Sequence, residues 1–191
     1  MKKRIVFTLA ILMAFAGSAW ADGWQSGLEV GGGARFELAL GDMKDHESGN
    51  FGFNVNAAWP LPLGLPDDGL LAAVGLTAET GVLFPLGKKD YIENWWALDF
   101  ALGAYVDLRI NELITIRPEL SADIRLNRVT SEENDVNGTF VDFGGRLGLD
   151  AVFSVSKNLL VKAGAGYTIL PEKDNVCHYM GIDVGAGYRF K

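Results

Sequence analysis

The sequence predicts an all-β protein, an eight-stranded antiparallel up-and-down transmembrane β-barrel. Two observations lead to this prediction. Hydrophobic residues make up 49% of the chain, yet no segment after residue 21 offers the run of about eighteen apolar residues that a spanning helix needs. The apolar residues instead recur at every second position, as they do in a strand with one apolar face. Since backbone groups in lipid must be paired internally, such a chain can span a membrane only as a closed barrel.

The alternation recurs in eight segments. In the clearest of them, Leu98 and Phe100 lie on the apolar face and Asp99 lies on the polar face. In the fifth segment Pro118 removes one backbone donor, so we expect a bulge or another irregularity there. The predicted strands cover residues 28–38, 51–61, 74–84, 96–109, 114–126, 139–155, 159–169 and 182–190.

The N-terminus reads as a secretory signal peptide over residues 1–21. A basic start is followed by the apolar run 5–16 and by Ala19-Trp20-Ala21, which has the A-x-A pattern of a cleavage site. Removal of this leader would take away Lys2, Lys3 and Arg4 and move the formal net charge from −7 to −10. The predicted domains are therefore the signal peptide 1–21 and a barrel domain 22–191. An acidic domain argues against nucleic acid and against acidic membrane surfaces as partners.

The C-terminus holds the most specific motif. Asp183 is followed by Gly185, and Tyr188 and Phe190 place aromatic rings two residues apart on the opposite face. This strand resembles the C-terminal signal strand of bacterial outer-membrane β-barrels, although Lys191 follows the last aromatic, where members of that group usually stop. The resemblance implies that Asp183, Gly185, Tyr188 and Phe190 form a signal that the barrel assembly machinery recognises.

Residues 22–191 as a whole resemble the small eight-stranded outer-membrane barrel families typified by the OmpA membrane domain, OmpX and OmpW. The resemblance implies localisation in the bacterial outer membrane after export to the periplasm. It also implies contact with outer-membrane lipid and lipopolysaccharide. A structural or surface-interaction role follows from it, with a surface ligand bound through the loops.

The connections fit this topology. Asn111-Glu112 and residues 156–158 form short turns at one end, where the connection 62–69 is longer. At the other end we expect more polar loops at 41–50, 85–94, 130–138 and 171–175. Short turns on the side of the termini and longer loops opposite are the outer-membrane arrangement.

The polar face is predicted to line the lumen. The apolar face has too many large side chains to fit inside an eight-stranded barrel, whose interior is just wide enough to be filled. Aromatic residues also gather near the strand ends, as at membrane interfaces. The predicted outer girdle is Phe51, Phe84, Trp95, Trp96, Phe140, Phe143, Tyr167 and Tyr179, and the periplasmic girdle is Trp24, Trp59, Phe153, Tyr188 and Phe190.

The lumen is then predicted to hold a network of ion pairs, because a buried charge without a partner is costly. The acidic members are Glu29, Glu37, Glu79, Asp99, Asp107, Glu119, Asp123, Asp142, Asp150 and Asp183. The basic members are Arg35, Arg109, Arg117, Arg125, Arg146, Lys162 and Arg189.

Three alternatives to a structural or surface-interaction barrel stay open. A narrow cation-preferring channel would use the same lumen charges, since acids outnumber bases. A lipocalin-like barrel would place the apolar face inside around a hydrophobic ligand. A lipid A-modifying hydrolase would need a nucleophile and base, and His46-Glu47-Ser48 has the His-x-Ser spacing of one such branch. The triplet falls in a polar loop, so we expect no catalytic residues and no enzyme activity. We also expect no metal site, since two His and one Cys are scattered, and no cofactor.

Overall fold

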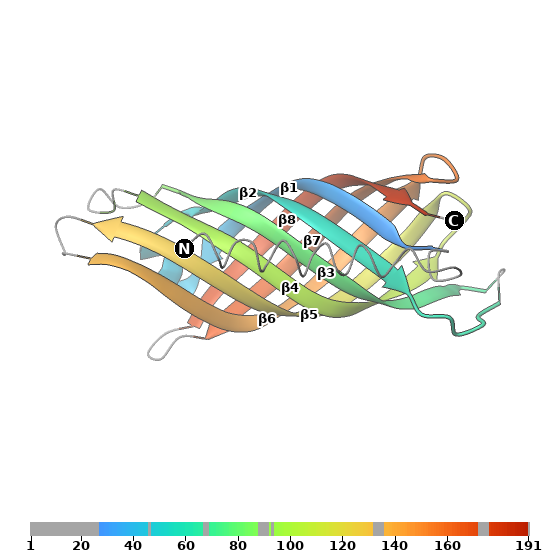
Figure 1. Cartoon of the computed structure of the whole chain (residues 1–191), viewed down its shortest axis with the longest axis horizontal. Coiled ribbons are helices and arrows are strands. Elements are labelled where there is room, and N and C mark those ends of the chain that lie inside the picture. Colours follow the sequence, from blue (N-terminus) through green and yellow to red (C-terminus); the bar gives the residue numbers. More distant parts are fainter. Residues whose placement is uncertain are drawn as a thin grey trace, which may run out of the picture.

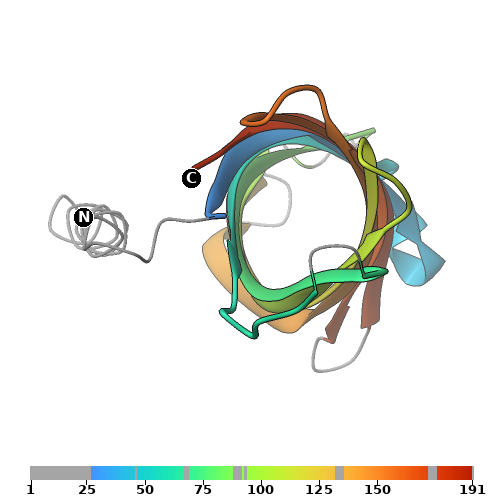
Figure 2. The same ribbon diagram turned by 90° about the vertical axis from the view of Figure 1, so that its right-hand side faces the viewer.

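The structure is a computed structural model that describes residues 27–45, 47–66, 69–87, 92, 94–131, 136–171 and 176–190. It is a closed barrel in which each strand pairs antiparallel with the next and β8 closes against β1 (Figures 1 and 2). The predicted fold class is confirmed. No helix among the described residues is both long and apolar enough to cross a membrane. The elements are β1 (Glu29–Leu40), the 3-10 helix η1 (Gly41–Asp45), β2 (Gly49–Pro60), β3 (Leu71–Leu86), β4 (Asn94–Arg109), β5 (Ile114–Ser131), β6 (Val136–Ser154), β7 (Leu159–Pro171) and β8 (Val176–Arg189).

All eight predicted strands are present, but several are longer than the alternation predicted. β5 has 18 residues and β6 has 19, whereas a tilted strand needs about 9–11 to cross a membrane. Pairing continues to Ser131 opposite Val136. The loop predicted at 130–138 is therefore wrong in extent, because the hairpin ladder runs through most of it and leaves only 132–135 as the connection.

Pro118 interrupts one ladder without shifting it. Between β4 and β5 the pairs are regular up to Tyr105 with Glu119 and resume at Leu108 with Ile116 in the same register. The pairing of Pro118 with Leu149 of β6 is kept. The expected irregularity is therefore a local gap in one ladder, and the register shift of this sheet region lies elsewhere, at Leu71 and Ala73 of β3.

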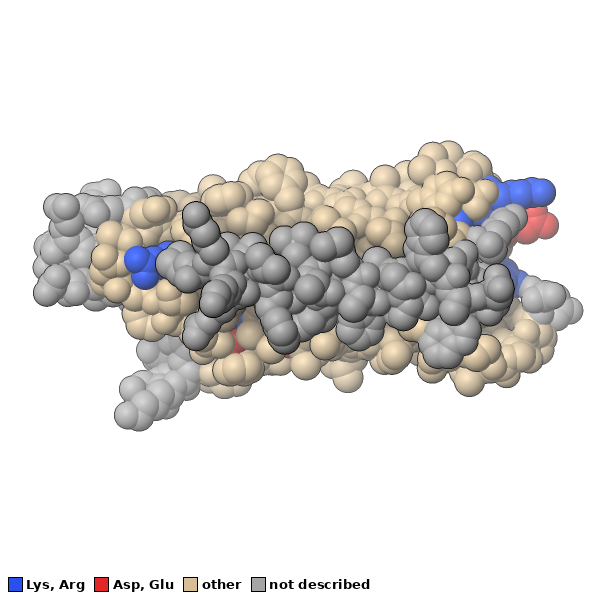
Figure 3. Space-filling view, in the orientation of Figure 1, with Lys and Arg blue, Asp and Glu red and all other residues tan. Residues whose placement is uncertain are grey.

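The exposure of the side chains decides which face points outward. Phe53, Leu102 and Val184 are 54%, 70% and 59% exposed, whereas Arg117 is 1% exposed. Where grey atoms do not cover it, the flank in Figure 3 is mostly tan, and the charged residues in view gather toward its ends. The apolar face is on the outside, so the lipocalin-like alternative, which needs that face inside, is wrong.

The seam between β1 and β8 is closed along its whole length. Gly33 pairs with Gly185, and a Cβ added to Gly33 would lie 2.4 Å from the carbonyl oxygen of Val184. Beyond β8, the backbone N of Phe190 donates to Leu28 O at 2.8 Å. Glycine at this position lets the two backbones approach, and the first and last strands fix each other.

Candidate functional site

The inward charges form two groups. The group nearer the termini, here called the terminal network, joins β1, β4, β5 and β8. Arg117 donates from Nε and Nη2 to both carboxylate oxygens of Asp107, at 2.7 and 2.8 Å, and from Nη1 to Glu29 at 2.7 Å. Arg189 donates from Nη2 to Glu29 at 2.6 Å. Bidentate pairing of a guanidinium with a carboxylate fixes geometry as well as charge, so this network ties four strands together across the lumen.

An aromatic ring, that of Tyr105, packs against the terminal network. The guanidinium carbon of Arg117 lies 4.2 Å from the centre of the Tyr105 ring, a distance that gives a cation–π attraction. The ring lies over Gly75 of the neighbouring strand, where a Cβ would meet the ring at 2.5 Å. Any larger residue at Gly75 would therefore displace the ring that holds Arg117.

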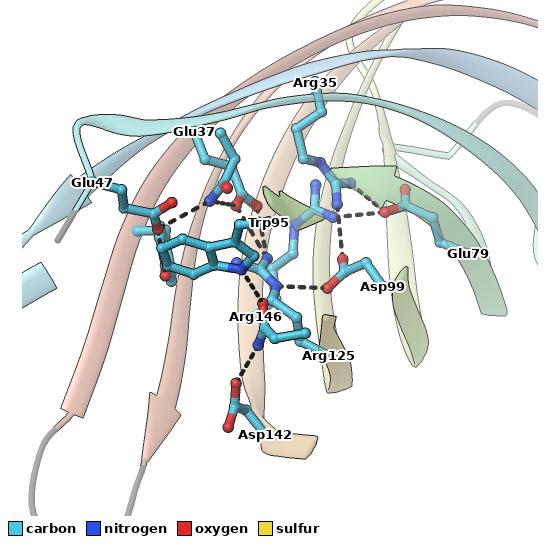
Figure 4. A network of polar contacts seen from close by, with 12 residues as sticks. Arg35, Glu37, Glu47, Glu79, Trp95, Asp99, Arg125, Asp142 and Arg146 are labelled. Atoms are coloured by element: carbon cyan, nitrogen blue, oxygen red, sulfur yellow. Dashed lines mark hydrogen bonds and ion pairs between the residues drawn. The ribbon is translucent and has the colours of Figure 1, made fainter. Parts of the chain in front are cut away.

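The second group, here called the central network, lies further along the strands from the termini, and Figure 4 shows most of its side chains. Arg35 of β1 pairs with Glu79 of β3 and with Asp99 of β4, the latter at 3.3 Å. Arg125 of β5 pairs with Asp99 at 3.0 Å and with Glu37 of β1 at 3.1 Å. Because β1 pairs directly only with β2 and β8, the ion pairs of Arg35 and Glu37 cross the lumen. The pair between Arg125 and Asp99 instead joins neighbouring strands along the barrel wall.

Arg146 of β6 extends the central network to the far wall. Its Nη1 lies 3.0 Å from Glu79, and its Nη2 lies 3.3 Å from Asp183 of β8. Asn54 adds a hydrogen bond to the other oxygen of Glu79 at 3.3 Å. The members of the central network are Arg35, Glu37, Glu79, Asp99, Arg125, Arg146 and Asp183.

The connection between β1 and β2 lies at the end of the barrel opposite the termini and contacts inward-facing side chains there. Gly41 has a φ of 59° and turns the chain into η1. Met43 of η1 packs against the buried cluster of Ala39, Leu170, Cys177 and Tyr179. Glu47 follows and is only 1% exposed. This connection folds inward, against side chains that line the lumen.

Glu47 joins the central network through polar contacts. Tyr179 donates from its hydroxyl to Glu47 Oε1 at 2.8 Å. Asn50 donates to Glu47 at 3.5 Å and to Glu37 at 3.3 Å. Glu37 is the partner of Arg125, so a chain of contacts runs from the connection between β1 and β2 into the central network.

Comparison with known proteins identifies the family. The description of the matching family model is outer membrane protein beta-barrel domain, and it matches residues 7–190. The chain belongs to this family. It is therefore a protein of the bacterial outer membrane, and its strands are transmembrane strands.

Solved structures support the fold of this outer membrane barrel. Ail, the attachment invasion locus protein of Yersinia pestis, matches with a TM-score of 0.60 and 17% identity over 86% of this chain and 99% of Ail. Neisserial surface protein A matches with a TM-score of 0.62 and 15% identity over 86% of this chain and 98% of that protein. Ail has also been solved with the heparin analogue sucrose octasulfate. No curated protein gives a significant match.

Six of the predicted lumen charges lie outside the two networks. Lys162 donates to Asn56 at 3.0 Å, and Asp142 accepts from Asn127 at 2.5 Å. Arg109 is half-buried at the end of β4. No ion pair within 4.0 Å joins the remaining three residues to any other described residue; these are Glu119, Asp123 and Asp150.

Three aromatic residues of the predicted outer girdle occupy inward positions of their strands instead: Trp95, Tyr179 and Phe140, the last of which is the ladder partner of Asn127. Tyr179 is 3% exposed and binds Glu47, and Trp95 donates from its indole to Asn127 at 3.1 Å. Both occupy odd positions of strands whose odd positions point inward, like Asp183 and Asp99. Extending the alternation of the last predicted strand from residue 182 back toward the N-terminus would have placed Tyr179 on the inward face. Trp24 lies outside the described residues.

Sequence reasoning missed the polar partners that are not charged. Asn50, Asn54 and Asn56 line β2 at even positions, facing the lumen with Glu79 and Lys162 as partners of the last two. Their positions in the alternation were a usable signal, because Asn54 and Asn56 lie on the polar face of residues 51–61.

Of the His46-Glu47-Ser48 triplet, His46 lies outside the described residues. Glu47 is buried among lumen groups, whereas Ser48 is exposed and its backbone bridges β1 and β3 through Ala39 N and Leu86 O. Glu47 and Ser48 therefore point into different surroundings, and the structure assigns Glu47 to the lumen mouth.

The burial of Glu47 makes the stability of this outer membrane barrel depend on pH. Burial raises the pKa of Glu47 from 4.5 to about 7, with the nearby Glu37 adding to the shift and Tyr179, Arg125 and Asn50 opposing it. An acid with a raised folded-state pKa binds its proton more tightly when folded. Its contribution to stability is complete below about pH 4.5 and is lost as the pH rises to about 7.

We therefore expect the free energy of unfolding to fall by about 3 kcal/mol from this group between those pH values. Replacing Glu47 with glutamine, which stays neutral, should remove that part of the pH dependence. The measurement is urea unfolding in detergent micelles at a series of pH values. Glu112→Gln, in an exposed turn, is the matched control and should leave the curve unchanged. Identical pH curves for the Glu47 variant and the wild type would contradict the assignment.

Proposed function

We propose that this chain is a closed outer-membrane barrel with a structural and surface-interaction role, and that its charge-paired lumen serves stability rather than transport. The observation on which this rests is the pair of networks that cross the lumen. Arg117 and Arg125 are 1% and 2% exposed, and each binds carboxylates from two other strands. Side chains that meet across the interior occupy the space that a water path would need.

The competing function is a narrow cation-preferring channel. A conducting path would require the central network to open, which separates buried charges from their partners at a cost of several kcal/mol. Four acids of the lumen stand outside the two networks, against the two bases Arg109 and Lys162, and this excess would favour cations if a path existed. The two functions differ in conductance and can be separated directly.

We expect the wild-type barrel in planar lipid bilayers to show no current steps above the lipid baseline. The double variant Glu37→Ala with Arg125→Ala removes one cross-lumen pair while leaving Asp99 paired with Arg35, and it should admit small currents. Lys157→Gln, in an exposed turn, is the charge-change control and should stay silent. Cation-selective steps from the wild type that change on neutralising Arg109 or Asp123 would instead establish the channel.

Surface interaction would use the four connections opposite the termini, at 41–48, 87–93, 132–135 and 172–175. These segments contain more than twice as many acidic as basic residues. The sulfated ligand seen with Ail is strongly anionic, so we do not carry it over to this chain. A cationic partner fits the charge of these loops better.

Insertion of the barrel is proposed to use the C-terminal strand. Tyr188 and Phe190 are 49% and 40% exposed, with ring centres 5.0 Å apart in an edge-to-face arrangement. Asp183 and Gly185 lie on the inward face of the same strand. This pattern supports recognition of Asp183, Gly185, Tyr188 and Phe190 by the barrel assembly machinery.

A further inference from the structure

One charged side chain stands on the lipid-facing surface. On the described strands, the outward positions are occupied by apolar, small or neutral polar residues and His178, with the single exception of Arg128 in β5. Every other Asp, Glu, Lys or Arg of these strands occupies an inward position. An arginine on the lipid face is strongly unfavourable at the bilayer midplane and close to neutral at the interface.

The position of Arg128 along β5 corresponds to the interface. It lies near the end of the strand at Ser131, far from the termini of the chain. Its direct ladder partners are Trp96 of β4 and Thr139 of β6, both outward-facing. Tryptophan favours the headgroup level of a bilayer. From Arg128 and its ladder partners toward the end with the termini, the next outward residues of β5 and β6 are apolar, such as Leu126 and Phe143. Arg128 therefore marks the boundary of the apolar band.

The guanidinium is held in place but keeps donors to spare. Arg128 donates from Nη2 to the side-chain oxygen of Asn137, also on the outward face. A guanidinium has five N–H donors, and within the described part of the chain the side-chain contact of Arg128 is the one with Asn137. On the described strands no outward carboxylate competes for these donors. A guanidinium fork binds a phosphate group through two parallel hydrogen bonds.

We propose that Arg128, supported by Asn137, Thr139 and Trp96, is a binding site for a phosphate group of the anionic lipid in the outer leaflet. In the outer membrane this lipid is lipopolysaccharide, and the phosphates at headgroup depth are those of lipid A. The acidic overall charge of the chain repels anionic surfaces in general, so the site supplies local recognition at one point of the barrel wall.

The test measures binding of lipid A to the folded, detergent-solubilised chain by native mass spectrometry. Bisphosphorylated lipid A should bind the wild type, and the dissociation constant should rise about tenfold in Arg128→Gln. Asn137→Asp places a carboxylate against the guanidinium and should cause a similar loss, which covers the case that Arg128→Gln fails to fold. Lys157→Gln removes one positive charge at the opposite end of the barrel and should bind like the wild type.

Three results would overturn the site. The first is equal affinity of Arg128→Gln, Asn137→Asp and the wild type for lipid A, as expected if Arg128 is neutralised by Glu132, Glu133 or Asp135 of the adjoining connection. The second is equal binding of dephosphorylated lipid A. The third is displacement of lipid A by millimolar inorganic phosphate, which would make the position a site for free anions. None of these results depends on whether the lumen conducts.

Discussion

Replacing Arg117 with glutamine should lower the free energy of unfolding by about 3–5 kcal/mol. The guanidinium is the shared partner of Asp107 and Glu29, at 2.7–2.8 Å, and all three residues are at most 5% exposed. Without Arg117, Asp107 loses its ion pair with that guanidinium, and Glu29 keeps only its ion pair with Arg189. A buried carboxylate that loses its counter-charge keeps its full desolvation penalty, which is why the loss exceeds that of a surface ion pair.

Equilibrium unfolding in urea, followed by the fluorescence of tryptophans such as Trp59, Trp95 and Trp96 of the barrel, measures this loss. The double variant Arg117→Gln with Asp107→Asn should recover part of it, because it removes the orphaned charge along with its partner. A non-additive cycle of this kind isolates the interaction between the two side chains. If the double variant is less stable than Arg117→Gln by the full cost of Asp107→Asn alone, Arg117 acts through packing on Tyr105 and not through the ion pair.

Two aspartates of the central region should respond in opposite ways to the same substitution. Asp99 accepts hydrogen bonds from Arg35 at 3.3 Å and from Arg125 at 3.0 Å. Asp99→Asn removes the charge that balances two buried guanidinium groups and should cost about 3–5 kcal/mol. The same urea titration, with heat-dependent gel migration as the check for a folded barrel, measures it.

Asp123 should tolerate the change. It is 1% exposed, and neither of its carboxylate oxygens accepts a hydrogen bond from the described arginines or amides. Asp99, of like charge, lies close enough to repel it. Asp123→Asn removes this repulsion and supplies an amide donor, so stability should stay the same or rise by about 1 kcal/mol. Equal losses for the two variants would contradict the contrast, and would indicate a cation or an unseen donor at Asp123.

The architecture could be predicted from the sequence because strand alternation and side-chain volume both indicated the same barrel. Alternation with a period of two identified all eight strands, and it placed charged residues such as Asp99 on the opposite face from Leu98 and Phe100. The choice of the outer face followed from volume, since the large apolar side chains cannot fit inside eight strands. These features are local or compositional, so no knowledge of tertiary contacts was needed.

The ends of the elements were predicted less well. The ladder between β5 and β6 extends into a segment read as a loop, because backbone pairing in a hairpin does not need an apolar face. Tyr179 was assigned to the outer girdle because its residue type suits an interface, although its position in the strand directs it inward. At both places the geometry of the strand outweighed residue type.

Charges of both signs in the lumen could be predicted from the alternation of each strand, because alternation assigns every side chain to one face. The partners of these charges depend on how the strands are brought together in space. Arg35 lies 64 residues from Asp99, and Arg117 lies 88 residues from Glu29; closure of the sheet brings them together across the interior. Closure of the barrel also buries Glu47 beside Tyr179 and Asn50. Pairing across a lumen depends on the register of all eight strands at once, and no local pattern in the chain encodes it.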